Sequence, residues 1–276
     1  MSKEYKLLKE AFDSIKKKIP YEPEVAITLG SGLGGFVDSL KQDAVISYSD
    51  VKNFPKTTNA AHSGKFIFAK INGVKTVVMQ GRIHSYEGYS TMECVRPVRL
   101  VKMMGAKVLV LTNAAGGINK KFKPGDLMML TDQISSFVNN PLVGENVEEL
   151  GERFPDMTNC YDLQLRKQIK AAAKKCKIDL KEGVYLQTQG PSYETAIEVK
   201  AFMAMGASAV GMSVTIETIA ARHCGLRVAG ISVITNLGTG LTKDLQSDDD
   251  VVKTANKAGN KLAKLIKTII TPKFVK

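Results

Sequence analysis

The stretch VAITLGSGLGGF, residues 25–36, joins an apolar run to a glycine-rich loop. Gly30, Gly32 and Gly35 match the spacing G-x-G-x-x-G, and Asp50 lies 20 residues beyond Gly30. This spacing is typical of a dinucleotide-binding loop between a strand and a helix. A glycine-rich backbone can equally hold another anion, because its amide groups can converge on one point. The motif alone leaves both interpretations open.

Short apolar runs rich in β-branched residues recur along the chain and predict a sheet. We expect strands over 25–29, 66–71, 75–79, 107–112, 126–131, 184–188, 208–212 and 228–235. Apolar residues at helical spacing predict helices over 3–18, 90–105, 160–176, 194–206, 216–225 and 249–270. This alternation predicts an α/β fold with a mixed central sheet flanked by helices on both faces.

The organisation along the chain indicates one domain over residues 1–276, because neither a linker nor an internal repeat interrupts the pattern. Residues 136–158 (SFVNNPLVGENVEELGERFPDMT) are rich in Asn, Gly, Glu and Pro and predict a long loop. A loop of this length in a compact domain usually has a function or forms an interface.

The composition narrows the classes of partner. The formal charge of +12 raises nucleic acid as a candidate, but only seven of the 39 basic residues are Arg. The lysines fall mostly on predicted helices, where they indicate a solvated face, so we expect no nucleic-acid partner. No apolar run approaches about 18 residues, so we expect no membrane partner either.

The N-terminus and the cysteines indicate a cytoplasmic protein. The segment MSKEYKLLKEAF is charged throughout, unlike a secretory signal. Four dispersed cysteines form no C-x-x-C pair, which argues against a zinc site or a disulfide framework. No GK[ST] follows the glycines and no H-E-x-x-H occurs, so we expect no metal and no cofactor.

Small or hydrogen-bonding residues follow six of the predicted strands. They occur in the segments GSGLGG, QGRIHSYEGY, NAAGG and QGPSYE, at Ser213, and at Thr235–Asn236. In open α/β sheets the ligand crevice lies outside the carboxyl ends of the strands. The six segments are therefore expected to converge on one site.

The residue types indicate two kinds of ligand group. Arg82 offers a planar cation, His84 lies two residues further on, and Ser31 and Ser213 add hydroxyls, which together suit free phosphate. Glu194 beside Tyr193, together with Asn236, suits a flat heterocycle with N–H donors and a carbonyl. With Tyr86 between the two sets, the pattern predicts a pocket for phosphate, sugar and base.

These segments resemble a known family. LGSGLGGF, GRIHSYEGY, LTNAAGGIN, GPSYET, AVGMS, ARHCGLRV and ITN together look like the trimeric purine nucleoside phosphorylases, over residues 20 to 270. The resemblance implies that GSGLGG is a phosphate loop rather than a dinucleotide loop. It also implies reversible phosphorolysis of purine nucleosides to free base and ribose 1-phosphate, with inorganic phosphate as co-substrate.

The resemblance assigns roles to individual residues. Phosphate would be bound by Ser31, His62, Arg82, His84, Ser213 and the backbone of Ala114. The ribose would contact Tyr86 and Met212, and the base would contact Tyr193, Glu194 and Asn236. Asn236, Glu194 and His84 are the expected catalytic residues. Phe154 would reach a neighbouring subunit's site, which implies a homotrimer.

Three further residues each keep two interpretations, and a fourth is given no role. Asp248 occupies the place where many members have a histidine at the ribose 5′-OH, and it could equally be a helix N-cap. Glu217 is a functional carboxylate or a helix N-terminal charge, with the second favoured. Glu87 stays open between function and surface charge, and His223 is expected to end a helix without a role.

Three rival functions stay open at this point. Methylthioadenosine phosphorylases of the same family have Asp where this chain has Asn236, whose amide suits 6-oxopurines such as hypoxanthine and guanine. An NAD-dependent enzyme would use Asp50 to end its second strand. A purine or phosphate binder could share the pocket without catalysing a reaction.

Overall fold

The computed structural model describes residues 2–58, 62–243 and 245–276. Its described residues form one sheet of nine strands in the order β2-β3-β4-β1-β5-β8-β7-β6-β9. The strands are β1 (Val25–Leu29), β2 (Gln42–Ser47), β3 (Lys65–Ile71), β4 (Val74–Gln80), β5 (Val108–Gly117), β6 (Leu127–Ile134), β7 (Leu180–Gln187), β8 (Ala209–Gly211) and β9 (Arg227–Leu237).

The sheet is mixed and partly closed. β1 runs parallel to β4 and β5, and β5 runs parallel to β9. β3 is antiparallel to β2 and β4, and β6 is antiparallel to β9. Because β5 pairs with β9 as well as with β8, the strands β5, β8, β7, β6 and β9 close into a ring.

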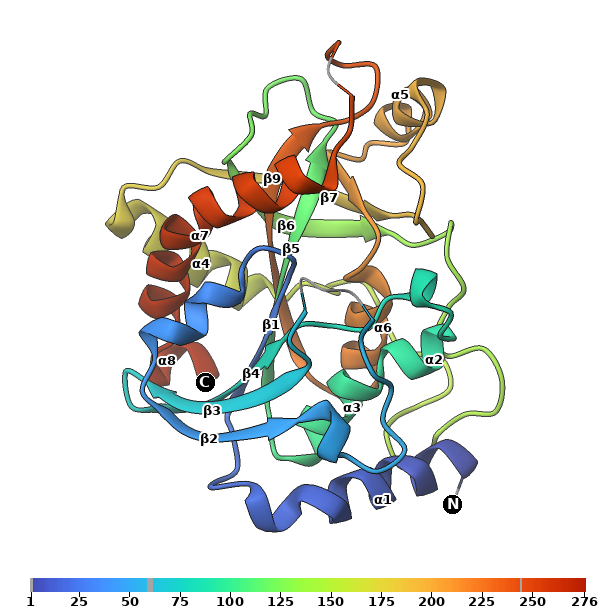
Figure 1. Ribbon diagram of the computed structural model, residues 1–276, viewed down its shortest axis with the longest axis vertical. Coiled ribbons are helices and arrows are strands. Elements are labelled where there is room, and N and C mark those ends of the chain that lie inside the picture. The colour runs from blue at the N-terminus through green and yellow to red at the C-terminus, as the bar shows by residue number, and fades with distance from the viewer. Residues whose placement is uncertain (1, 59–61, 244) are drawn as a thin grey trace.

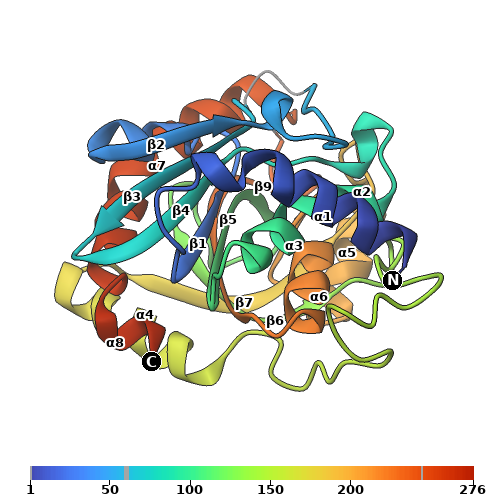
Figure 2. The ribbon, with the colours of Figure 1, turned by 90° about the horizontal axis from the view of Figure 1, so that it is seen from below.

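Helices cover both faces of the sheet (Figure 1, Figure 2). They are α1 (Lys3–Ile15), α2 (Thr91–Cys94), α3 (Arg96–Met103), α4 (Leu163–Cys176), α5 (Ala196–Ala204), α6 (Thr215–His223), α7 (Asp248–Ile269) and α8 (Pro272–Val275). Short 3-10 helices are η1 (Lys16–Lys18), η2 (Gly34–Ser39), η3 (Tyr48–Asp50) and η4 (Ser85–Glu87).

Side chains of β1 alternate between two hydrophobic cores, as the pleat of a strand requires. Ala26 packs in the core shared with α1, α3 and α6. Ile27 packs in the core shared with α4, α7 and α8. All five residues of this strand are buried, which explains why its sequence reads as a continuous apolar run. The predicted α/β fold with a mixed, doubly covered sheet is confirmed.

The structure shifts several predicted boundaries. The segment 90–105 forms two helices that meet at Val95, with Pro97 in the first turn of α3. The segment 160–176 becomes helical only at Leu163, because Asp162 caps α4 by accepting from the amide of Leu165. The predicted loop over 136–158 is confirmed, since no helix or strand occurs there among the described residues.

Strand β2 is missing from the sequence prediction. Gln42 and Asp43 are exposed, and only Ile46 is fully buried, so this edge strand lacks an apolar run. It exists because it pairs antiparallel with β3, which its own sequence does not reveal.

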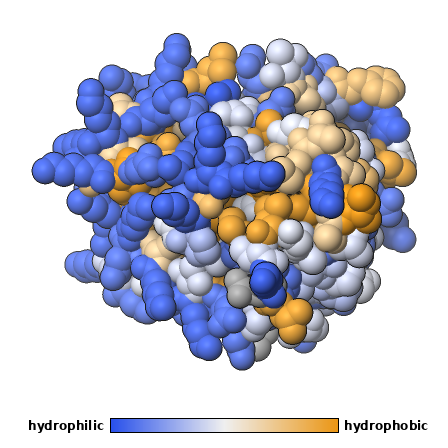
Figure 3. Space-filling view, turned by 90° about the horizontal axis from the view of Figure 1, so that it is seen from above, coloured by the Kyte–Doolittle hydropathy of each residue, from blue (hydrophilic) through white to orange (hydrophobic). Residues whose placement is uncertain are grey.

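The lysines of α4 and α7 lie on solvent-exposed faces, as predicted; Lys170, Lys174, Lys253 and Lys257 are exposed. Figure 3 shows hydrophilic side chains crowding one side of the upper face, with apolar side chains gathered toward the other side. None of the described helices has the length and apolar composition to cross a membrane.

Candidate active site

A cavity of about 480 Å³ lies where the six polar segments meet. Its lining includes the following residues proposed from the sequence: Ser31, Arg82, His84, Tyr86, Ala114, Tyr193, Glu194, Met212, Ser213, Asn236 and Asp248. They follow or end β1, β4, β5, β7, β8 and β9, or begin α7. The volume is that of a small-molecule site. The structure therefore brings the two predicted residue sets into one cavity.

The glycine loop after β1 packs directly against β5. A Cβ atom on Gly30 would lie 2.5 Å from the Cα of Asn113, so only glycine fits. The loop continues into the short helix η2 rather than a long one. Asp50 lies in η3 on the surface and pairs with Lys18 at 3.1 Å, rather than ending a strand beside the loop. The context that a dinucleotide site requires is therefore missing from these segments.

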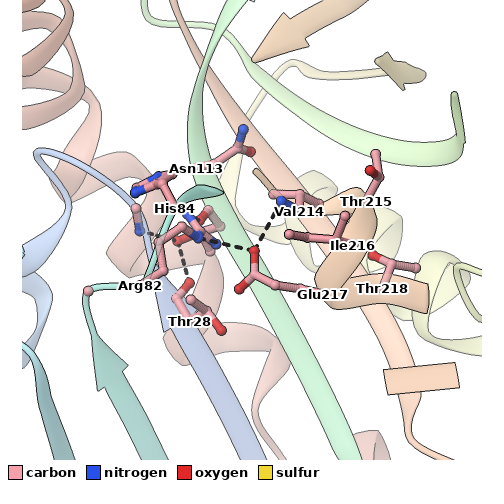
Figure 4. A network of polar contacts seen from close by, with 12 residues as sticks. Thr28, Arg82, His84, Asn113, Val214, Thr215, Ile216, Glu217 and Thr218 are labelled. Carbon is pink, nitrogen blue, oxygen red and sulfur yellow. Dashed lines mark hydrogen bonds and ion pairs between the residues drawn. The ribbon is translucent and has the colours of Figure 1, made fainter. Parts of the chain in front are cut away.

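The guanidinium of Arg82 is buried and held on two sides (Figure 4). Its Nε donates to Oε2 of Glu217 at 3.1 Å, and its Nη1 donates to the carbonyl of Thr112 at 3.0 Å. Its Nη2 is buried without a hydrogen-bond partner among the described residues. A buried cationic donor without a partner is costly, so Nη2 is a ready contact for an anion.

Three aromatic rings stack in a column beside Arg82. The rings of His62 and His84 are 5.2 Å apart at 22°, and those of His84 and Tyr86 are 4.6 Å apart at 18°. His62 does not line the cavity, but its Nε2 lies 3.5 Å from the Oγ of Ser31. Burial lowers the pKa of His62 to about 3 and also lowers the pKa of His84. Both rings are therefore neutral at pH 7.

Glu87 fixes the orientation of His84. Its Oε1 accepts from the backbone amide of His84 at 2.8 Å and lies 3.3 Å from Nδ1 of the same residue. Burial raises the pKa of Glu87, but hydrogen bonds from His84 and Thr58 outweigh burial and lower it to about 2. The ionised carboxylate requires a donor at Nδ1, which leaves Nε2 of neutral His84 as an acceptor. The open interpretation of Glu87 is thus narrowed to a partner of His84.

Hydrogen bonds also orient the two base-reading candidates. The hydroxyl of Thr188 donates to Oε1 of Glu194 at 2.8 Å. The Oδ1 of Asn236 accepts from the hydroxyl of Thr235 at 2.9 Å, and its Nδ2 donates to Oε1 of Gln246 at 2.6 Å. The carboxylate and the amide are therefore held in place before any ligand binds.

Comparison with known proteins identifies the family. Residues 24–271 match the model of the phosphorylase superfamily. Purine nucleoside phosphorylase 1 of Geobacillus stearothermophilus is 42% identical over 263 residues, covering 95% of this chain and 96% of that protein. The chain belongs to the purine nucleoside phosphorylase family.

Further members of this family are similar along most of the chain. Purine nucleoside phosphorylase of Mus musculus is 45% identical over 221 residues, covering 78% of this chain and 76% of the mouse protein. The crystal structure of Schistosoma mansoni purine nucleoside phosphorylase in complex with inosine has a TM-score of 0.91 and 37% identity. It covers 96% of this chain and 95% of that chain.

Two of the interpretations made from the sequence need correction in this phosphorylase. Asp248 is the first residue of α7, and Ser247 occupies the N-cap position, so the helix N-cap interpretation of Asp248 is wrong. Asp248 lines the cavity instead. Glu217 does lie in the first turn of α6, where it accepts from the amide of Val214 at 3.0 Å. It is nevertheless more than a helix-end charge, since it also pairs with Arg82.

Two of the residues considered in the sequence analysis lie outside the cavity. One contacts the long loop over residues 136–158, and the other is exposed on that loop. His223 is the last residue of α6, as predicted. It is buried, and its Nε2 lies 3.2 Å from Oδ1 of Asn146, so it has the structural role of attaching the end of α6 to the loop. Phe154 is 84% exposed and lines a second cavity of about 470 Å³. The single chain does not bring Phe154 to the first cavity.

Sequence reasoning did not single out several residues that line the cavity of this phosphorylase, and two of these, Asn113 and Gln246, carry side-chain amides. Asn113 lines the cavity and accepts from the hydroxyl of Ser232 at 2.7 Å, which ties β5 to β9. Its place in the polar segment NAAGG is a signal that could have revealed it. Gln246 lies ten residues beyond Asn236 in a loop with no local pattern, so no sequence signal marked it.

Proposed function

We propose that this cavity binds inorganic phosphate and a purine nucleoside together and transfers the ribosyl group from base to phosphate. The products are a free purine base and ribose 1-phosphate, or deoxyribose 1-phosphate from a deoxynucleoside. Membership of the purine nucleoside phosphorylases supports this reaction over that of methylthioadenosine phosphorylase. The observation that carries the proposal is one cavity lined both by Arg82 and by the pair Glu194 and Asn236.

The phosphate half of the proposal uses five side chains and one backbone group. They are Ser31, His62, Arg82, His84, Ser213 and the backbone of Ala114, with His62 acting from behind Ser31. The partnerless Nη2 of Arg82 supplies a cationic donor. Neutral His84 keeps Nε2 as an acceptor, so it can take a hydrogen bond from a protonated phosphate oxygen. Phosphate of either protonation state thus finds matching groups.

The base half of the proposal uses Tyr193, Glu194 and Asn236. As the glycosidic bond breaks, the ribose gains positive charge and the purine gains negative charge. Asn236 stabilises the leaving base through N7, and Glu194 holds its N1–H side, while the ring of Tyr193 packs on its face. Phosphate beneath the anomeric carbon stabilises the cation and then captures it. Tyr86, Met212 and Asp248 contact the ribose, with Asp248 at the 5′-OH.

The proposed preference is for 6-oxopurine nucleosides such as inosine and guanosine. The amide of Asn236 both donates and accepts: Nδ2 can donate to the carbonyl of these bases, and Oδ1 can accept from N7–H once N7 of the leaving base takes up a proton. Adenine presents an amino group in place of that carbonyl, so one polar contact is lost or repulsive.

The proposal includes a homotrimer and a cytoplasmic role in purine salvage. Phe154 is 84% exposed on the long loop, which suits a side chain that completes a neighbouring subunit's site. The four cysteines are free and buried, which suits a reducing compartment. No metal and no organic cofactor enters the proposed reaction, because the charges that develop are met by Arg82, phosphate and neutral donors.

A substrate panel tests the proposal. We would measure base release from inosine, guanosine, adenosine and methylthioadenosine at saturating phosphate. The proposal expects inosine and guanosine to react fast and the two adenine compounds slowly. Faster release from methylthioadenosine would contradict the assignment of base and 5′ contacts, and no release from any of them would leave a binding protein.

A further inference from the structure

Glu217 connects Arg82 with the turn that carries Ser213, two parts of the phosphate site that are far apart in the sequence (Figure 4). It is 5% exposed, and its Oε2 accepts from Nε of Arg82 at 3.1 Å and from the amide of Val214 at 3.0 Å. Val214 directly follows Ser213, which lines the cavity. One carboxylate oxygen therefore holds both the guanidinium and the turn that carries the serine.

The turn at Ser213–Thr215 is strained. Val214 has φ of 82° and ψ of −52°, and the amide of Thr215 donates to the carbonyl of Ser213 at 3.1 Å. This is the rare form of the γ-turn, and a β-branched residue at positive φ is an outlier. Such a conformation persists only when the surroundings hold it from several sides.

The side chains of Glu217 and Gln187 accept hydrogen bonds from the amides of this turn, and Gln133 donates to the carbonyl of Thr215 at 3.3 Å. The Oε1 of Gln187 accepts from the amide of Thr215 at 2.9 Å and from its hydroxyl at 2.7 Å. Glu217 holds the preceding amide, that of Val214. Without Glu217 the amide of Val214 loses its acceptor, while Gln187 and Gln133 still hold Thr215, so Ser213 can move with Val214 toward an unstrained conformation.

The guanidinium of Arg82 depends on the same carboxylate. A planar guanidinium fixed at Nε and Nη1 has its Nη2 fixed as well. Among the residues that the structure describes, loss of the contact at Nε leaves the carbonyl of Thr112 as the one hydrogen-bond partner of the guanidinium, which permits the group to rotate.

We propose that Glu217 is a positioning residue, which holds Arg82 and Ser213 in the one arrangement that binds phosphate. The inference rests on the proposed function of the cavity, and it assigns Glu217 no contact with substrate. It explains why a carboxylate stands behind an anion site at all, since its charge alone would repel the phosphate.

Charge and positioning predict opposite results. If the charge of Glu217 were its main effect, Glu217→Gln would tighten phosphate by relieving repulsion. If positioning is the main effect, Glu217→Gln weakens phosphate, because a neutral amide oxygen accepts more weakly from the guanidinium of Arg82 and the amide of Val214 than a carboxylate does. Glu217→Asp keeps the charge but is one methylene shorter, so positioning predicts weaker phosphate binding there too.

The test compares the KM for phosphate with the KM for inosine in wild type, Glu217→Gln and Glu217→Asp. We expect the phosphate KM to rise roughly tenfold or more, on the scale of one charged hydrogen bond, with the inosine KM within about twofold. Glu4→Gln is the matched control, since Glu4 is also buried and pairs with Arg96 at 2.9 Å, and neither residue lines the cavity. The control is expected to lower Tm without changing the phosphate KM.

A double variant isolates the path through Arg82. If Glu217 acts through Arg82, Glu217→Gln adds little to the phosphate KM once Arg82→Met is present. Gln187→Met removes the acceptor of the Thr215 amide without touching the ion pair, and we expect it to raise the phosphate KM as well. It also serves as the test if the Glu217 variants fail to fold.

The rise in Tm on adding inorganic phosphate gives a readout that needs no turnover. Wild type is expected to be stabilised by phosphate, and Glu217→Gln much less. An unchanged or lower phosphate KM in Glu217→Gln, with phosphate still raising Tm, would overturn the inference while leaving the reaction intact. A wild type that neither turns over nor responds to phosphate would instead overturn the proposed function, and the inference with it.

Discussion

The side-chain amide of Asn236 donates to Oε1 of Gln246 at 2.6 Å, and Gln246 in turn donates to the carbonyl of Leu237 at 3.1 Å. Both amides line the cavity. The residue proposed to read the purine is therefore itself oriented by a second amide from the loop before α7. This relationship makes Gln246 a candidate determinant of base selectivity.

Replacing Gln246 by Leu removes the oxygen that fixes Nδ2 of Asn236. We expect kcat/KM for inosine to fall by about fivefold to tenfold, the scale of one neutral hydrogen bond, with the phosphate KM unchanged. The inosine-to-adenosine ratio is also expected to fall. Gln168→Leu is the control, because Gln168 lies on α4 outside the cavity lining and donates to the carbonyl of the exposed Lys273. An unaltered ratio would show that Gln246 does not orient the base reader.

Asn236→Ala tests the leaving-group contact itself. Removing a donor that meets developing charge typically costs about 100-fold or more in turnover. We expect kcat on inosine to fall on that scale. Phosphate is still expected to raise Tm, since the residues proposed to bind phosphate belong to other strands or to the loops that follow them. Steady-state kinetics beside thermal unfolding would check this, and near-wild-type turnover would contradict the role given to Asn236.

Acid is expected to destabilise the fold through the buried histidines. Burial lowers the pKa of His62 from 6.5 to about 3. Between these two pH values the unfolded chain binds a proton at His62 and the folded chain does not. Stability is therefore fully present above pH 6.5 and falls as the pH drops toward 3, by about 1.4 kcal/mol for each unit. Urea unfolding at pH 7 and 5 is expected to differ by about 2 kcal/mol less in His62→Gln than in wild type. Equal pH dependence in the two proteins would refute this.

Gly30→Ala is expected to damage both stability and activity. The added Cβ would lie 2.5 Å from the Cα of Asn113, and the nearest atoms are all backbone of the central strand β5, which leaves little room to shift. Overpacking of this kind costs about 1–3 kcal/mol. Gly35→Ala is the matched control in the same loop, since its Cβ would meet nothing closer than an Asp38 oxygen at 3.8 Å. Thermal unfolding of the pair would measure the difference, and equal Tm values would count against the close packing.

Phe154→Ala tests the contribution from a neighbouring subunit. Because Phe154 is 84% exposed on the single chain, its loss is expected to leave the fold of each chain intact, as circular dichroism would show. The KM for inosine is nevertheless expected to rise several-fold, by loss of one aromatic contact of about 0.5–1.5 kcal/mol. Ile197→Ala, at a residue 71% exposed, is the control. Light scattering that showed a fully active monomer would contradict both the shared site and the trimer.

The central strands can be predicted from the sequence because a strand buried on both faces consists of consecutive apolar residues. Every residue of β1 is buried, so its apolar run is visible without any partner. β2 shows no such apolar run, because it is an edge strand whose polar side chains face solvent and which forms by pairing with β3. Helix ends follow caps such as Asp162, which the periodicity of apolar residues does not register.

In the candidate site, too, some residues can be predicted from the sequence and others cannot. Residues at strand ends, such as Arg82 and Asn236, can be found by their position after an apolar run. The partners that orient them cannot, because Glu217 lies 135 residues from Arg82 and meets it only in the folded chain. Gln246 is hidden for the same reason, since a loop residue shows no periodicity.

The central claim is tested most directly by the sugar product formed from inosine in the presence of inorganic phosphate. The account predicts ribose 1-phosphate in equal amount to hypoxanthine, with almost no base released when phosphate is left out. Free ribose as the product, or hypoxanthine release that does not depend on phosphate, would contradict it.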